Sequence, residues 1–100
     1  MSYEAGSLNA TIALAAGGDP ALFHELRSAF AKSAEQQFDL MQRSRCDGNW
    51  NLAAMRLKGL AASFYAKALI ELAEEALDGA PGDPLVLRRI RAFLDQIAAD

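Results

Sequence analysis

Residues 50–59 read Trp-Asn-Leu-Ala-Ala-Met-Arg-Leu-Lys-Gly, and this stretch decides the fold. At about 100° per residue, the apolar positions of 49–64 fall on one side of a helix. This core stripe consists of Trp50, Ala53, Ala54, Leu57, Leu60, Ala61 and Phe64. Met55 falls nearly opposite the centre of the stripe, and the residues that share its outer face are Asn51, Lys58, Gly59 and Ala62. The pattern therefore predicts an amphipathic helix that turns Met55 toward solvent.

Glycine and proline divide the rest of the chain into helical segments. Asp19-Pro20 and Asp83-Pro84 each offer an aspartate that can cap a helix and a proline suited to its first turn. Two glycines precede the first pair, and a Cys-Asp-Gly-Asn run forms a further break. We therefore expect helical sequence near 7–16, 20–45, 49–78 and 84–98.

The segment 49–78 contains no proline, so it could be one helix or two. A single helix of about 30 residues would be long, since the mean is roughly 11–12. Ser63, Phe64 and Tyr65 are three weak helix formers in succession. We therefore predict a short turn at these residues, with a helix on each side.

The other segments also carry apolar stripes at helical spacing. In 20–45 the predicted core side is Leu22, Phe23, Leu26, Ala29, Phe30, Leu40 and Met41. In 66–78 it is Ala66, Leu69, Ile70, Ala73 and Leu77, and in 84–98 it is Val86, Leu87, Ile90, Phe93, Leu94 and Ile97. Amphipathic helices joined by short loops pack well side by side. The sequence predicts an all-α fold, an antiparallel up-down-up-down four-helix bundle with a short N-terminal lid helix, as one domain over 1–100.

Composition and charge exclude several classes of function. A net charge of −3 and a pI near 5.0 argue against nucleic acid as a partner, which requires a cationic face. No apolar run approaches the roughly 20 residues that span a bilayer, and the first residues lack the pattern of a signal peptide. Cys46 is the only cysteine, so no intramolecular disulfide is possible. We expect a cytoplasmic protein without a metal site, a cofactor or a membrane partner.

Two motifs at a fixed distance resemble those of histidine phosphotransfer (HPt) domains. The first is the turn Asp47-Gly48-Asn49-Trp50, which is similar to the family's Gly-Asp-Trp turn, and the second is the run from Ala54 to Gly59. Further positions that agree with the family are Asp19, Pro20, Leu26, Phe30, Leu40, Ala66 and Leu69. The resemblance covers roughly residues 8–98 and implies a phosphorelay function.

In HPt domains a His-x-Leu-Lys-Gly run carries the phosphoacceptor, and here Met55 stands in place of the histidine. By resemblance, Lys58 orients or offsets the phosphoryl charge and Gly59 makes room for the partner's loops. A thioether carries no transferable proton and forms no stable phosphoryl adduct, so no catalytic residue is expected. Tyr65 also departs from the family, which commonly has glycine there.

Gly59 suggests a binding face in its own right. A mid-helix glycine costs about 1 kcal/mol relative to alanine, which a helix tolerates where another molecule approaches its backbone. We predict a flat contact shelf that consists of Asn51, Met55, Arg56, Lys58, Gly59 and Ala62. The expected partner is a response-regulator receiver domain or a histidine kinase, bound by a monomer without phosphotransfer.

Other interpretations stay open at this stage. The protein could be an active relay whose phosphoacceptor is another residue, or a helical scaffold that serves an unrelated partner. The only histidine, His24, has no Lys-Gly at the right offset and is expected to be a solvated surface residue. Cys46 is expected to be a structural residue at a helix end, and the acidic run at 71–75 and the basic run at 88–91 to be solvated helix faces.

Overall fold

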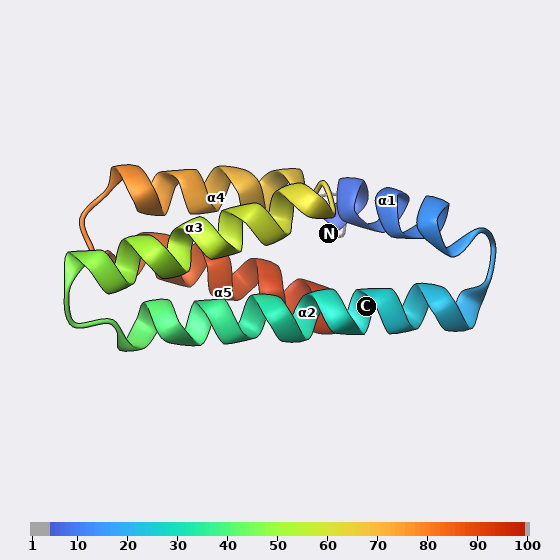
Figure 1. Ribbon diagram of the computed structural model, residues 1–100, viewed down its shortest axis with the longest axis horizontal. Helices are drawn as coiled ribbons and strands as arrows, with labels where there is room; N and C mark the ends of the chain where they lie inside the picture. The colour runs from blue at the N-terminus through green and yellow to red at the C-terminus, as the bar shows by residue number, and fades with distance from the viewer. Residues whose placement is uncertain (1–4, 100) are drawn as a thin grey trace.

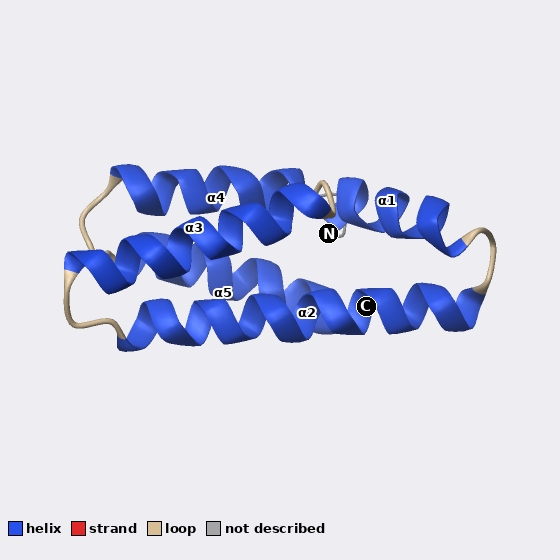
Figure 2. Ribbon diagram, in the orientation of Figure 1, coloured by secondary structure: helices blue, strands red, loops and turns tan. Residues whose placement is uncertain are grey.

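The computed structural model describes residues 5–99 and is helical throughout that range, with short loops and no strand (Figure 2). The helices are α1 (Gly6–Ala16), α2 (Pro20–Arg43), α3 (Asp47–Ser63), α4 (Lys67–Asp78) and α5 (Pro84–Ala99). This confirms the all-α prediction and places every expected helix within a few residues of its predicted bounds. The predicted domain also includes residues 1–4 and 100, which lie outside the described residues.

The Asp-Pro pairs start helices as predicted. The Asp19 carboxylate accepts hydrogen bonds from the backbone N–H groups of Ala21 and Leu22, at 3.0 and 3.3 Å. Asp83 accepts one from the backbone N–H of Leu85, at 2.9 Å. Each aspartate thereby satisfies donors that the first helical turn leaves without a partner.

The predicted turn after Ser63 separates α3 from α4. The backbone N–H of Tyr65 donates to the Ala62 carbonyl and that of Ala66 to the Ala61 carbonyl, the two bonds of a Schellman motif. The first residue after the C-cap of the helix in this motif adopts the left-handed conformation, and this residue is Tyr65, with a φ of 51°. Tyr65 therefore adopts the conformation that glycine adopts most easily.

The helices pack side by side in a closed circuit. α2 contacts α3, α3 contacts α4, α4 contacts α5, and α5 contacts α2. The chain reverses direction at each loop between them (Figure 1). α1 packs on α2, beyond the ends of α3 and α4 and over the N-terminal part of α2 (Figure 1). None of the helices in the described part of the chain is long and apolar enough to cross a membrane.

The buried side chains confirm the predicted core of α5 and correct that of α2. Val86, Ile90, Phe93, Leu94 and Ile97 are buried as expected, and Leu87, the sixth predicted core residue, is half-buried against them. In α2 the buried apolar residues are Phe30, Ala34, Phe38 and Met41, whereas Ala29 and Leu40 are exposed. The buried set repeats every three or four residues and so forms one narrow stripe, and Ala29 and Leu40 lie off it. Leu22, Phe23 and Leu26 are half-buried because this end of α2 projects past α3 and α4 (Figure 1).

Side-chain hydrogen bonds tie the helices together at several places in the described part of the chain. The Trp50 indole N–H donates to the Ala76 carbonyl at 2.9 Å, which joins α3 to α4. The Ser7 hydroxyl accepts from the backbone N–H of Lys67 at 3.0 Å, so α1 supplies a cap to the start of α4. The Arg27 guanidinium donates to the Asn9 side chain and to the Ile97 carbonyl, and thereby joins α1, α2 and α5.

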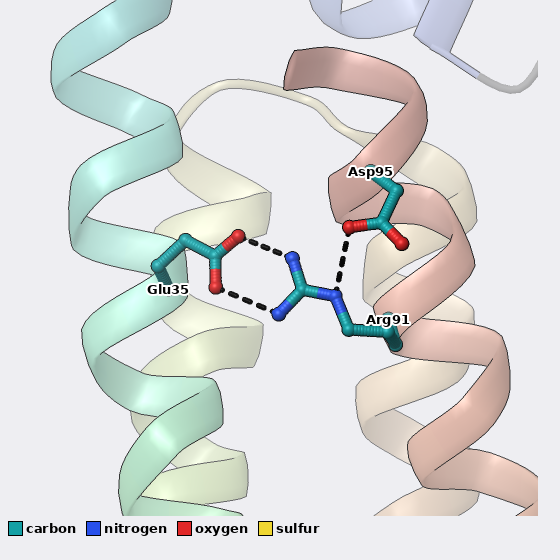
Figure 3. Close-up of polar contacts among 3 residues, drawn as sticks. All are labelled: Glu35, Arg91 and Asp95. Atoms are coloured by element: carbon teal, nitrogen blue, oxygen red, sulfur yellow. Dashed lines mark hydrogen bonds and ion pairs between the residues drawn. The ribbon is translucent and has the colours of Figure 1, made fainter. Parts of the chain in front are cut away.

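A further connection is an ionic cluster between α2 and α5 (Figure 3). Arg91 binds the Glu35 carboxylate through both terminal nitrogens and donates from Nε to Asp95 at 2.9 Å. The guanidinium also lies over the Phe38 ring, 5.2 Å from its centroid. The hydrogen bonds to Glu35 raise the pKa of Arg91 above its ordinary value. The cluster joins α5 to α2.

Candidate functional site

α3 carries the candidate site because two neighbouring helices cover only one of its sides. Its core stripe lies against α2 and α4, and Trp50, Ala53, Ala54, Leu57 and Ala61 are all buried. The opposite side carries Met55, whose side chain is 60 % exposed. The outward position of Met55, predicted from helical phase, is therefore confirmed.

The structure places all six predicted shelf residues on accessible parts of α3. Five of them are exposed, namely Asn51, Met55, Arg56, Gly59 and Ala62. Lys58 is half-buried, and its ammonium lies 3.2 Å from a carboxylate oxygen of Glu74 on α4. Its charge is thus directed toward α4, at the edge of the shelf, and a partner would meet Lys58 together with Glu74.

No side chain of the protein accounts for the glycine at position 59. A Cβ atom built on Gly59 has no neighbour within 4 Å, so a larger residue would meet open space. The Ser63 hydroxyl donates to the Gly59 carbonyl at 3.0 Å, and this bond needs no glycine. Internal packing therefore does not require Gly59, which leaves a flat, open stretch of backbone one turn after Met55.

Replacing Gly59 with alanine is expected to stabilise the isolated protein by about 1 kcal/mol, because alanine is the better helix former and meets no clash. In a domain of this size that corresponds to a rise in melting temperature of roughly 4–8 °C. Ala62→Gly, on the same exposed face, is the reciprocal control and should destabilise by a similar amount. Thermal unfolding followed by circular dichroism measures both, and a destabilised Gly59→Ala variant would contradict this account.

Sequence reasoning missed a groove beside the shelf, between α2 and α3. It has a volume of about 290 Å³ and is lined by Leu40, Arg43, Ser44, Asn49, Leu52, Ala53 and Arg56. Leu40 was predicted in the core and is 40 % exposed, and Leu52 is 48 % exposed. The helical phase of Leu52 lies between those of Met55 and Arg56, so the same phase calculation would have placed Leu52 on the outer face.

Met55 offers no group that could exchange a proton or hold a phosphoryl group. The thioether is a weak hydrogen-bond acceptor without a proton to exchange. His24 is exposed on α2, and its ring lies nearly perpendicular to that of Phe23, with 5.7 Å between the ring centroids. Cys46 is exposed at the N-terminal cap of α3, and its side chain makes no capping hydrogen bond. Within residues 5–99 no group of three or more His, Cys, Asp or Glu side chains is placed to hold a metal ion.

Comparison with protein-family models, with curated proteins and with solved structures finds no match to this chain. A functional proposal for the protein therefore rests on its own residues and on their geometry.

Proposed function

We propose that the protein is an HPt-like docking protein of a phosphorelay, which binds a receiver domain or a histidine kinase without transferring phosphate. The observation that carries the proposal is the outward position of Met55, where the resembling family has its phosphoacceptor histidine. Lys58 and the open backbone at Gly59 follow at the spacing of the family's motif. The protein would occupy the partner's surface and so modulate the phosphorelay.

The arrangement of the helices supports this proposal. We infer an HPt-like antiparallel up-down-up-down bundle of α2 to α5, with α1 as a lid over the projecting end of α2. The closed circuit of helix contacts and the reversal of the chain at each loop are consistent with it (Figure 1). In such a bundle α3 has two neighbours and one free side, which is the side that carries Met55.

The chemistry of methionine fits docking. Its flexible, polarizable side chain adapts to apolar surfaces of varied shape. The neighbouring Gly59 and Ala62 are small, so a partner's loop or helix can approach the backbone of α3 closely. The shelf is modest in extent, and we expect micromolar affinity, as in other transient signalling contacts.

The substitution Met55→Glu tests the proposal. A carboxylate at the centre of the shelf would lose apolar contact and would have to be desolvated on binding, so affinity should fall about tenfold or more. Isothermal titration calorimetry against receiver domains and histidine kinases of the same phosphorelay measures the change. Leu85→Glu is the matched control, because Leu85 is 51 % exposed but lies at the start of α5.

Each other outcome identifies a rival function. Unchanged affinity of Met55→Glu, or an equal loss in Leu85→Glu, would reject the shelf as the docking site. Protein-bound phosphate after incubation with a phosphorylated receiver, detected by mass spectrometry, would establish an active relay with a different acceptor. Failure to bind any receiver or kinase would favour a helical scaffold for another partner.

A further inference from the structure

Apolar side chains gather at the groove between α2 and α3. Leu40 and Leu52 stand on its two walls, and the nearly buried Ala53 contributes to its lining. Met55 continues the exposed apolar surface one helical turn farther along α3. Contiguous exposed apolar side chains on a water-soluble surface are typical of a site that another protein covers.

The same groove carries positive charge in an acidic protein. Arg43 and Arg56 line it, whereas the whole chain has a net charge of −3. Arg43 forms an exposed ion pair with Asp39, with 3.0 Å between the two charged groups. Such a pair contributes little to stability, so Arg43 can leave Asp39 for a partner's carboxylate. In the described part of the chain Arg56 forms no ion pair with a carboxylate. The groove therefore combines an apolar interior with two guanidinium groups that can donate hydrogen bonds to carboxylates of a partner.

We propose that this groove binds an amphipathic helix of the partner, with an apolar side chain between Leu40 and Leu52 and flanking carboxylates on Arg43 and Arg56. The proposal rests on the proposed function, because the groove extends the same docking surface toward the start of α3. A third helix can pack into the groove between two adjacent antiparallel helices. The groove volume of about 290 Å³ suits a few side chains better than a bound small molecule. Opposite charge selects the partner and speeds its association.

A second apolar groove lies at the turn between α1 and α2 and is the strongest rival location. It is lined by Ala13, Ala16, Gly18, Asp19, Pro20, Phe23 and His24. It contains an aspartate and no arginine or lysine, so it offers an acidic helix no counter-charge. The charge of a bound helix therefore distinguishes the two grooves.

Two synthetic helical peptides serve as probes. Both carry a stripe of leucines along one face, which is flanked by glutamates in the first peptide and by lysines in the second. Fluorescence anisotropy with the full chain should show binding of the glutamate peptide that weakens as salt is added, and little binding of the lysine peptide. Arg43→Glu should lower the affinity for the glutamate peptide about tenfold, and Leu52→Ser should lower it about fivefold. The matched controls Arg88→Glu and Leu85→Ser, both on exposed positions of α5, should change affinity by less than about twofold.

Several results would overturn the proposal. These are equal binding of the two peptides, an equal loss in the α5 control variants, and amide chemical-shift changes centred on the turn between α1 and α2. Receiver or kinase titrations separate this proposal from the proposed function, since Arg43 and Leu52 lie outside the shelf. If Met55→Glu weakens a receiver while Arg43→Glu and Leu52→Ser do not, only the groove proposal fails. If the glutamate peptide is selected and no receiver or kinase binds, only the proposed function fails.

Discussion

Replacing Trp50 with alanine should remove about 3–5 kcal/mol of folding free energy, the usual cost of truncating a buried aromatic residue. Trp50 is fully buried between α3 and its neighbours, and its indole N–H donates to the Ala76 carbonyl. The substitution would leave a large cavity and would also remove a donor from that buried carbonyl. Because small domains are stable by only about 5–15 kcal/mol, the variant is expected to be partly unfolded at physiological temperature.

Urea unfolding measures this effect, and it must be followed by circular dichroism because Trp50 is the only tryptophan. Trp50→Phe separates the two contributions, since it retains most of the ring and loses the hydrogen bond. We expect this variant to lie between the wild type and Trp50→Ala, with a loss of about 1–3 kcal/mol. A loss below about 1 kcal/mol in Trp50→Ala would show that α3 is not anchored through this residue.

Local chemistry made most of the helix boundaries predictable. The Asp-Pro pairs act through hydrogen bonds to residues two or three positions ahead, and these bonds are present at Asp19 and Asp83. The turn after Ser63 followed from weak helix formers, and α3 ends there. The outward position of Met55 followed from helical phase alone. Each of these features depends on residues within one or two turns, which a sequence displays directly.

The features that were missed depend on contacts between distant segments. Ser7 caps α4 across 60 residues, and Lys58 meets Glu74 only because α3 lies beside α4. Leu40 appeared to be a core residue because it is apolar and adjacent to Met41, but its side of α2 faces the groove rather than the interior. The groove itself needs both helices, so neither helix sequence predicts it alone. The apolar pattern predicted which segments form helices. Which apolar side chains of those helices remain exposed depends on how the helices pack together.

Under the proposed function, replacing Met55 with histidine is expected to create a phosphoacceptor. Met55 is exposed, so Met55→His should fold like the wild type, and the new imidazole would lie one turn before Gly59 with Lys58 beside it. The unprotonated ring nitrogen would attack the phosphorus of a receiver's aspartyl phosphate, forming a P–N bond while the aspartate leaves as a carboxylate. Since an ordinary imidazole has a pKa of about 6.5, the rate should rise with pH through the range of about 5.5 to 7.5.

Incubation of Met55→His with a receiver whose aspartyl phosphate is radiolabelled, followed by gel electrophoresis, measures the gain. We expect an acid-labile, alkali-stable label on Met55→His and none on the wild type, because a thioether holds no phosphoryl group. Leu85→His places a similarly exposed histidine on α5 and should remain unlabelled, which separates a docked phosphotransfer from accidental reaction of any surface imidazole. Equal labelling of the two variants, or none on Met55→His with a receiver that the protein binds, would mean that the shelf does not bring position 55 to the partner's phosphoryl group.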